Sequence, residues 1–333
     1  MTRELTTHSH AVNEALVILI PLFNDWVALD KLLVLLDRTL DENGLAAGVL
    51  IVNDGSTEEP GDGFARQVFR ALRQIDVLDL RRNLGHQRAI ALGLAFAEDK
   101  GSCETLVIMD SDGEDDPRDI PRLLAKYRQQ GGNQIVFAER ARRTESLLFR
   151  MFYVLYKSFH FWLTGYRVRV GNFSAIPRSR LASLVVVSDL WNHYAAAVFK
   201  SRQPYCTLPT SRAKRLHGQS KMNFVGLVIH GLSAISVYSE IVGVRLLLVC
   251  VALILLSLFG VACTVYVRLT TNLGIPGWAT STVGILLVIL FQAVMLSFIF
   301  SFVILAGRQG SSFLPLRDYP YFIFRVRPLC RER

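Results

Sequence analysis

The stretch Val107-Ile-Met-Asp-Ser-Asp-Gly-Glu-Asp-Asp-Pro117 decides how the rest of the chain is interpreted. An apolar, β-type run stops there in five acidic residues, which are Asp110, Asp112, Glu114, Asp115 and Asp116. Hard divalent cations such as Mg²⁺ and Mn²⁺ take oxygen ligands, usually one or two carboxylates together with waters and substrate phosphates. An Asp-x-Asp pattern at a strand end therefore indicates a site for a metal-bound diphosphate.

A purely structural interpretation explains part of this cluster. Asp115 and Asp116 have the positions of an N-cap and a first-turn acid in a helix opened by Pro117. That interpretation does not explain Asp110 and Asp112, so the hypothesis of a metal and phosphate site rests on these two residues.

Composition places part of the chain in a membrane. The 333 residues are 51% hydrophobic, which is high for a soluble protein. The net charge of +9 rests on Lys and Arg that are scattered through the first half of the chain and concentrate around the later apolar runs, without an RNA-reading motif. An anionic membrane surface and phosphate substrates explain the charge better than nucleic acid does. The five cysteines form no Cys-x-x-Cys, so neither a disulfide framework nor a zinc site is indicated, and a reducing cytosolic face fits.

Short β-branched runs alternate with helical patterns as far as about Ala138. The predicted strands are residues 16–20, 48–52, 75–80, 105–109 and 134–138, and helical patterns cover Trp26 to Leu40 and Gln87 to Glu98. This alternation predicts an α/β domain with a mostly parallel sheet. Residues 1–14 form a polar segment before it, and we expect no cleaved targeting peptide.

Each of the first four strands ends in a polar loop. The loops are residues 21–25, 53–57 and 81–86 and the acidic cluster. Taken alone, Asp54-Gly55-Ser56 is more typical of a turn and helix cap than of a ligand site. Because ligands of open α/β sheets bind beyond the carboxyl ends of the strands, the four loops together predict one pocket.

Two uncharged apolar runs, at about 246–267 and 283–306, are long enough to cross a membrane as helices. Lys and Arg lie before and after this predicted hairpin, against Arg268 alone near its connector, so both termini are expected on the cytoplasmic side. An amphipathic pattern at 146–165 fits a core helix and an interface helix equally well, whereas the one at 223–243 leads into the first span and favours the membrane interface. Residues 308–333 are expected to form a basic tail along the membrane surface.

Five motifs, in this order, resemble those of the membrane-anchored polyprenyl-phosphate glycosyltransferases of glycosyltransferase family 2, relatives of the dolichyl-phosphate mannose synthases. The motifs are Pro21-Leu-Phe-Asn-Asp25, Asn53-Asp-Gly-Ser56, Arg82-Asn-Leu-Gly-His86-Gln, Asp110-Ser-Asp112 and Arg215-Leu-His-Gly-Gln-Ser-Lys221, followed by the two spans. The resemblance implies a Rossmann-like GT-A domain over residues 15–222, a nucleotide-sugar donor, Mg²⁺ or Mn²⁺, and a polyprenyl-phosphate acceptor such as undecaprenyl phosphate at the inner membrane. A UDP-sugar is the favoured donor and GDP-mannose the second; a homo-oligomer is possible.

The resemblance also implies roles for individual residues. Donor-binding residues would be Pro21, Phe23, Asn24, Asp25, Asp54, Ser56, Asn83, Gly85, His86 and Asp110. Metal ligands would be Asp110, Asp112 and Glu114, while Asp112, Arg140, Arg215 and Lys221 would serve catalysis, the three basic residues by clamping phosphates.

This chain departs from the family pattern at several positions. The family usually has Asp at position 53, Glu at 25, Gln at 114, and Asp-Phe-Arg where this chain has Asn172-Phe-Ser174. Glu114 still offers a carboxylate oxygen, whereas the missing arginine at Ser174 bears on how acceptor or sugar is held. These departures keep a non-catalytic membrane scaffold open as an alternative. A polysaccharide synthase ranks last, because two spans are too few for a translocating channel and no Gln-x-x-Arg-Trp occurs.

Overall fold

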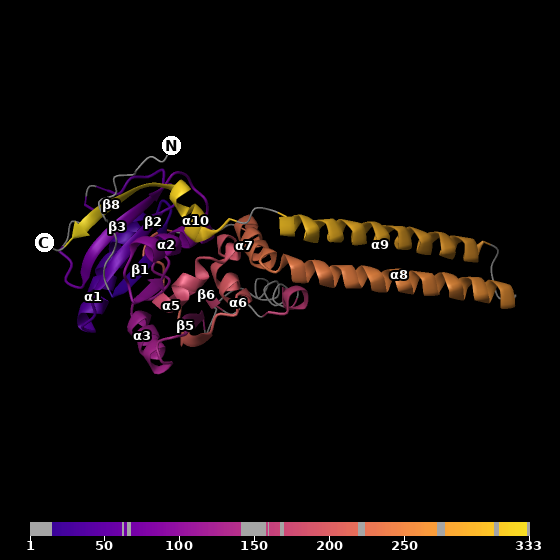
Figure 1. Ribbon diagram of the computed structural model, residues 1–333, viewed down its shortest axis with the longest axis horizontal. Helices are drawn as coiled ribbons and strands as arrows, with labels where there is room; N and C mark the ends of the chain where they lie inside the picture. The colour runs from indigo at the N-terminus through magenta and orange to yellow at the C-terminus, as the bar shows by residue number, and fades with distance from the viewer. Residues whose placement is uncertain are drawn as a thin grey trace. The chain divides into compact units, whose positions relative to one another are not determined.

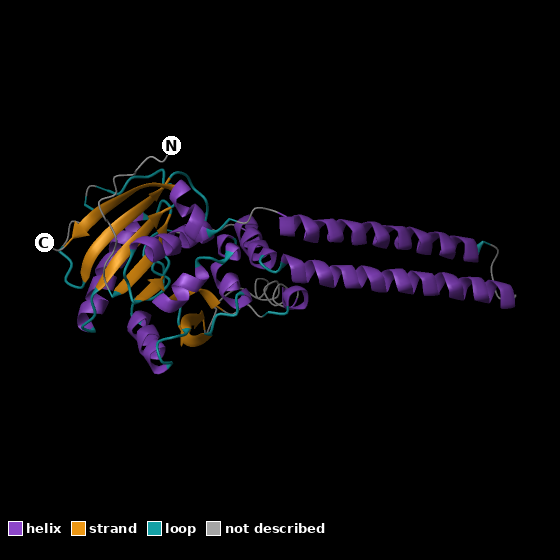
Figure 2. Cartoon of the chain, in the orientation of Figure 1, coloured by secondary structure: helices purple, strands orange, loops and turns teal. Residues whose placement is uncertain are grey.

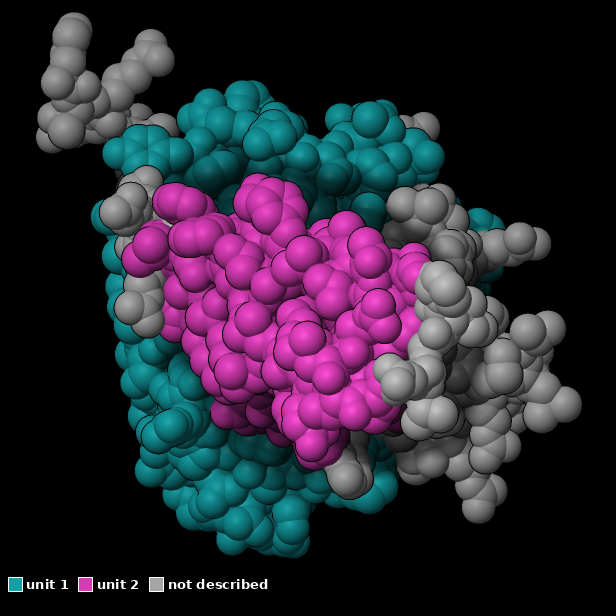
Figure 3. Space-filling model, turned by 90° about the vertical axis from the view of Figure 1, so that its right-hand side faces the viewer, with its two compact units in different colours: residues 1–150, 168–237, 312–333 teal, residues 151–167, 238–311 magenta. Residues whose placement is uncertain are grey.

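The computed structural model describes residues 15–61, 63–64, 68–140, 158, 160–166, 170–218, 224–271, 277–309 and 313–331. The chain divides into two compact units, residues 1–150, 168–237 and 312–333, and residues 151–167 and 238–311 (Figure 3). The first unit is an α/β domain and the second is dominated by two long helices (Figures 1 and 2).

One mixed sheet organises the first unit. Within the described residues its eight strands follow the order β7-β5-β6-β4-β1-β2-β3-β8. Their bounds are Leu16–Leu22 (β1), Ala47–Asn53 (β2), Leu72–Leu80 (β3), Thr105–Ile108 (β4), Ile135–Arg140 (β5), Val170–Pro177 (β6), Tyr205–Thr210 (β7) and Ile323–Arg331 (β8). The predicted mostly parallel sheet is thus confirmed, with all five predicted strands present.

The direction of the strands gathers many loops at one edge. β6 runs antiparallel to both β4 and β5, so β5 runs in the same direction as β4, and β7 is parallel to β5. β1 to β4 run parallel to one another. Six strands therefore end at the same edge, where the antiparallel strands β6 and β8 begin.

Helices cover both faces of the sheet because both faces are apolar. In β1, Ile18 and Ile20 pack with α1 (Trp26–Glu42) and α3 (Asp119–Gln129), while Val17 and Leu19 pack on the other face with α2 (His86–Lys100). The short helices α5 (Arg178–Leu184) and α6 (Tyr194–Lys200) and the turn η1 (Ser188–Trp191) extend that second layer. The result is a three-layer α/β/α domain whose central strand is buried throughout.

The C-terminal segment corrects a prediction. Residues 308–333 were expected to be a membrane-surface tail, but α10 (Pro315–Asp318) and η2 (Tyr319–Tyr321) lead into β8, which pairs antiparallel with β3. Arg325 and Arg327 of β8 both contact the carboxylate of Asp79 on β3. The basic residues thus have a partner inside the domain, and the predicted tail is wrong for residues 323–331.

Two long apolar helices dominate the second unit (Figure 1). α8 spans Ser239–Thr270 and α9 spans Trp278–Gln309; both are long and apolar enough to cross a membrane. Only 11% and 6% of their most apolar windows are buried, unlike the core helix of a soluble protein. Exposed apolar surface of this extent requires lipid or a partner, so the helices match the predicted transmembrane hairpin.

The contact between α8 and α9 uses small side chains. The buried residues of α8 are Gly243, Cys250, Ser257 and Thr264, each seven positions from the next. A methyl group added at Gly243 would lie 2.6 Å from the Ile304 side chain of α9. A seven-residue spacing keeps one seam facing the partner helix, as in left-handed coiled coils, and small residues allow close approach.

The two predicted amphipathic helices are only partly within the described residues. Of the predicted helix at 146–165, residues 158 and 160–164 are helical and most of the others lie outside the described part. The predicted helix at 223–243 is divided: α7 spans Phe224–Ser236 and α8 begins at Ser239.

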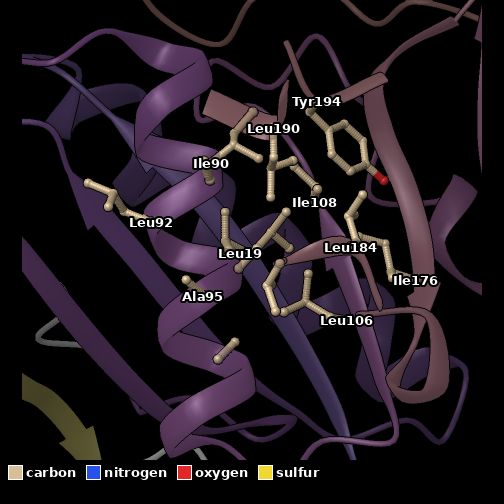
Figure 4. Packing of buried hydrophobic residues seen from close by; sticks show 14 of the residues in the cluster. Leu19, Ile90, Leu92, Ala95, Leu106, Ile108, Ile176, Leu184, Leu190 and Tyr194 are labelled. Carbon is tan, nitrogen blue, oxygen red and sulfur yellow. The ribbon is translucent and has the colours of Figure 1, made fainter. Parts of the chain in front are cut away.

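Close packing of α2 on the sheet yields a prediction. Ile90 and Ala95 of α2 lie against Leu19 and the β4 residues (Figure 4). At Gly93 an added Cβ would lie 2.6 Å from both Leu19 Cδ1 and Val52 Cγ2. We expect Gly93→Ala to lower the free energy of unfolding by about 1–3 kcal/mol through overpacking, measured by denaturant titration in detergent. Gly61→Ala, which meets open space, is the control; equal stability of the two variants would contradict this packing.

Candidate active site

The acidic loop after β4 is folded around its own carboxylates. The buried Asp115 accepts a hydrogen bond from the backbone N–H of Asp110 (3.0 Å), and Asp112 Oδ1 accepts one from the N–H of Glu114 (2.9 Å). Asp116 is paired with Arg118 just before α3. Asp115 therefore shapes the loop rather than capping a helix. Because Asp112 uses Oδ1 within the loop, its Oδ2 is directed at other parts of the chain.

Arg215 joins two of the predicted site loops. Its guanidinium contacts Asp112 Oδ2 at 3.1 Å and also pairs with Asp25, which follows β1. The three side chains are only 13–17% exposed. A guanidinium can bind two oxygen acceptors at once, so one residue from the loop after β7 holds the loops after β1 and β4 together.

The loop around Arg215 is docked on the acidic loop by its backbone. The N–H of Ala213 donates to the carbonyl of Glu114 (2.9 Å), and that of Leu216 donates to the carbonyl of Asp112 (3.0 Å). Arg212 also forms an ion pair with Glu114. Basic and acidic loops thus meet as two paired segments at the edge where β4 and β7 end.

Gly113 is required by this docking. Its φ is +79°, a conformation that L side chains rarely adopt. An added Cβ would lie 2.4 Å from Leu216 Cγ. The glycine therefore permits both the turn of the acidic loop and the close approach of Leu216.

The second and third loops are tied together by Asp54. Its carboxylate accepts hydrogen bonds from the N–H groups of Leu84 (2.7 Å) and Gly85 (2.8 Å). Burial raises the pKa of Asp54 above its usual value, and these two hydrogen bonds act against the rise. Asp54 was predicted to bind the nucleotide-sugar donor, but both of its carboxylate oxygens accept hydrogen bonds from the backbone. In this structure Asp54 therefore positions the loop before α2.

Five further residues of the predicted donor site lie in or beside these loops. Asn24 has a φ of +50° and donates its backbone N–H to Ser56 Oγ (2.9 Å). Phe23 is 41% exposed, whereas Pro21 is buried as a member of β1. Asn83 packs by its backbone against Gly55. Arg140 ends β5 at the same edge, but its side chain lies outside the described part, as does Lys221.

His86 sits between two polar side chains at the start of α2. Its Nε2 lies 3.3 Å from Asp110 Oδ1 and 2.9 Å from the amide of Asn172. Gln87 in turn donates to Asn172 (3.1 Å). Sequence analysis marked Asn172 only as a departure from a family pattern; a lone amide far along the chain gives no signal that it reaches His86.

The carboxylates at this edge raise the pKa values of both His86 and Asp112. Desolvation acts to lower the pKa of His86, but the carboxylates of Asp110, Asp115 and Asp54 outweigh it and raise that pKa. The pKa of Asp112 is raised by burial and by Asp110, while Arg215 opposes the rise. Neighbouring carboxylates therefore need cations at this edge.

Each of the three predicted metal ligands faces a basic side chain. Asp110 faces His86, Asp112 faces Arg215 and Glu114 faces Arg212. Among the described residues no three His, Cys, Asp or Glu side chains form a complete metal site. The donor set nevertheless fits Mg²⁺ or Mn²⁺ bound by one or two carboxylates plus the phosphates of a ligand, which is the usual mode of Mg²⁺.

Comparison with known proteins relates this domain to glycosyltransferases. Residues 17–179 match the model of glycosyl transferase family 2. Over 282 residues the chain is 25% identical to the uncharacterized glycosyltransferase sll0501 of Synechocystis, covering 81% of this chain and 84% of that protein. It is 28% identical over 147 residues to YkcC of Bacillus subtilis, an uncharacterized glycosyltransferase, covering 41% of this chain and 42% of YkcC.

A third relative has a named substrate. The chain is 28% identical over 130 residues to the undecaprenyl-phosphate 4-deoxy-4-formamido-L-arabinose transferase of Salmonella paratyphi B, covering 39% of this chain and 38% of the transferase. The matches thus span about two fifths of YkcC and of this transferase. Among solved structures, glucosyl-3-phosphoglycerate synthase of Mycobacterium tuberculosis superimposes with a TM-score of 0.44 at 16% identity, covering 69% of this chain and 81% of the synthase.

The docked basic loop can be tested by proteolysis. Gly113→Ala should release the loop at residues 212–216, because backbone strain of about 1–3 kcal/mol adds to the clash with Leu216. We expect tryptic cleavage after Arg212 and Arg215 to become roughly tenfold faster, the change that about 1.4 kcal/mol of local stability produces. Mass spectrometry of the peptides measures the cleavage rates.

Gly131→Ala provides the matched control for this test. Gly131 also has a positive φ (+72°), but an added Cβ there meets open space. Equal cleavage rates in the two variants would show that Leu216 and Gly113 do not hold the loop.

Proposed function

Because residues 17–179 form a glycosyl transferase family 2 domain, we propose that this protein transfers a sugar from a nucleotide-sugar donor to the phosphate of a polyprenyl carrier lipid. The observation that carries the proposal is the bridge from Arg215 to Asp25 and Asp112, which brings a guanidinium and two carboxylates together at one edge of the sheet. Undecaprenyl phosphate is the proposed acceptor, with a UDP-sugar as first and GDP-mannose as second choice of donor.

The membrane hairpin supports a lipid acceptor. α8 and α9 are long and apolar enough to cross a bilayer, and a polyprenyl phosphate is held in the same membrane by its own chain. One relative at 28% identity is named for undecaprenyl phosphate. We place the catalytic domain and both termini on the cytoplasmic side, where nucleotide sugars are made and where the flanking Lys and Arg are expected. The product would supply lipid-linked sugar for modification of cell-envelope glycans.

The donor's diphosphate defines the roles of the acidic residues. Asp112 and Asp110, with Glu114 beside them, would hold Mg²⁺ or Mn²⁺. A bound divalent cation neutralises phosphate charge and stabilises a nucleoside diphosphate as leaving group. Asn24, Asp25 and Ser56 lie in the neighbouring loops, where the nucleoside would bind.

The basic residues would bring two anionic substrates together. Arg215 already lies between two site loops, and Arg140 ends β5 at the same edge. With Lys221 they would screen the repulsion between lipid phosphate and sugar diphosphate. Attack of the phosphate oxygen on the anomeric carbon, opposite the leaving nucleotide, would invert the configuration of the sugar.

The central test is transfer of labelled sugar from nucleotide donors to undecaprenyl phosphate, with Asp112→Asn as the key variant. We expect a loss of more than about 10²-fold in turnover, the scale of removing a preorganised electrostatic group. Asp116→Asn, which alters an acid paired with Arg118 in the same loop, should retain activity. Chelator should abolish transfer, and a near-normal Asp112→Asn enzyme would refute the assignment.

Stability separates loss of chemistry from loss of fold. The pKa of Asp112 is raised in the folded protein, so the stability that its protonated form contributes is lost as pH rises through that pKa. Asp112→Asn stays uncharged and should unfold at no lower temperature than the wild type at neutral pH.

A thermal-shift series with UDP, GDP and dTDP, with and without Mn²⁺, identifies the donor base, because ligand at about 100 times its dissociation constant adds roughly 2.7 kcal/mol to the free energy of unfolding.

Transfer to a phosphate should need no protein general base. A phosphomonoester oxygen is already anionic at neutral pH, since its second ionisation lies near about 6, whereas a base normally contributes about 10²- to 10⁴-fold. We expect single amide variants of Asp115, Asp116, Glu139 and Glu145 to keep the pH profile of the wild type; Glu145 lies outside the described residues. A variant that binds donor normally, loses transfer and gains a new basic limb would show that a base is used.

A further inference from the structure

A buried carboxylate on β3 is held by residues that are far apart in the sequence. Asp79 is 5% exposed and accepts hydrogen bonds from Arg325 Nε (2.8 Å) and Arg327 Nε (3.0 Å) at the same oxygen, Oδ2. Its Oδ1 accepts a bond from Asn53 Nδ2 (2.8 Å) at the end of β2. Both arginines come from β8, the strand that follows the membrane hairpin in the sequence.

Hydrogen bonds lead from this carboxylate into the loops at the sheet edge. Asn53 Oδ1 accepts the backbone N–H of Ser56 (3.1 Å), and Ser56 Oγ accepts the backbone N–H of Asn24 (2.9 Å). The side chain of Asn24 then accepts from the N–H groups of Thr57 (2.8 Å) and Glu58 (3.1 Å). The next residue in the chain is Asp25, the partner of Arg215.

We propose that Arg325 and Arg327 are positioning residues for the donor site: by neutralising Asp79 they let Asn53 fix the loop at residues 53–58 and, through it, Asn24. The inference rests on the proposed function in so far as the loop binds a nucleotide. The arginines act through Asp79 and Asn53 and need not touch the donor. The segment after the membrane hairpin thereby becomes part of the catalytic domain's binding machinery.

The chemistry of position 53 follows from this arrangement. An amide donates to Asp79 with Nδ2 and accepts from Ser56 with Oδ1, so it satisfies both neighbours at once. A carboxylate at 53 has no hydrogen to give and would face the Asp79 carboxylate across one hydrogen-bond distance. Two like charges so close cannot both ionise without penalty. An asparagine at position 53 therefore fits beside the Asp79 carboxylate, whereas an aspartate does not.

Removal of both arginines should disturb the loop through charge. Asp79, whose side chain is only 8% exposed, would stay buried beside Asn53 without a cation, and a buried carboxylate left without its partners is unfavourable. The carboxylate can regain water only if the strand end and Asn53 move. The amide hydrogens of Ser56, Thr57 and Glu58 report this movement directly, because each is bonded in the network.

The experiment compares Arg325→Ala/Arg327→Ala with the same double variant carrying Asp79→Asn, in the full-length protein in detergent. Hydrogen exchange of the three loop amides should accelerate at least about tenfold in the double variant. UDP, GDP and dTDP in Mn²⁺ are the probes, and the dissociation constant of the one that binds should rise by a similar factor, seen in assays as a higher donor KM with little change in kcat. Asp79→Asn should bring both readouts to within about threefold of wild type, because the charge that needed neutralising is gone.

A matched control separates positioning from general weakening of the strand. Val326 lies between the two arginines and packs on the apolar core. Val326→Ala should lower the unfolding temperature and leave loop exchange and nucleotide affinity unchanged. If Val326→Ala changes them as much as the double variant does, β8 acts only through fold stability and the proposal is wrong.

The reciprocal exchange tests the amide at position 53. Asn53→Asp should accelerate loop exchange, and Asn53→Asp/Asp79→Asn should restore it, since the pair again has one amide and one carboxylate. Failure of Asp79→Asn to rescue the arginine variant overturns the proposal and indicates direct contact of the arginines with the nucleotide. If wild type binds none of the three nucleotides while loop exchange responds as expected, the proposed function fails and the positioning role stands.

Discussion

Carboxylates gathered at one edge of a sheet repel one another, and this domain depends on the cations that separate them. Asp112 is paired with Arg215 and Glu114 with Arg212, in each case an acid after β4 and a base after β7. Pairing of partly buried charges stabilises little in net terms, because desolvation offsets the attraction, but an acid without its partner is costly. The pairs therefore act mainly by fixing which loops meet. They also place several basic and acidic side chains at one edge of the sheet, where a charged ligand can bind.

The same rule explains why the chain returns to the sheet after the two long apolar helices α8 and α9. Without β8, β3 would be the edge strand of the sheet, with the buried carboxylate of Asp79 beside Asn53. β8 covers that edge and brings Arg325 and Arg327 to Asp79. An uncovered edge strand is open to pairing with other chains, so one segment satisfies both the backbone of the edge and the charge beneath it.

Local patterns were sufficient for β1 to β5 among the eight described strands, for the loops after the first four strands and for the two long apolar helices, because period, turn residues and apolar length are read over short windows. That the loops carrying Asp25 and Asp112 open at one edge followed from parallel strand direction, whereas a role for Arg215 beside them came only from the family resemblance. The strand that leads to Arg215, β7, was not predicted. β8 was missed because its apolar positions are interrupted by arginines and by Pro328, a pattern shared with membrane-surface segments. Its strand character depends on Asp79, a partner far away in sequence, which a local pattern does not contain.

Departures from a family pattern can mark lost chemistry or altered packing, and the contacts distinguish the two. Asn53 is bonded to Asp79 and Ser56, and Asn172 is bonded to His86 and Gln87, so neither substitution leaves a gap. At position 174 the serine is buried, and its hydroxyl lies 2.7 Å from the hydroxyl of Tyr194. The residues at these positions all have hydrogen-bond partners, as expected where a site keeps its function with different side chains. This argues for a working enzyme and against a non-catalytic scaffold.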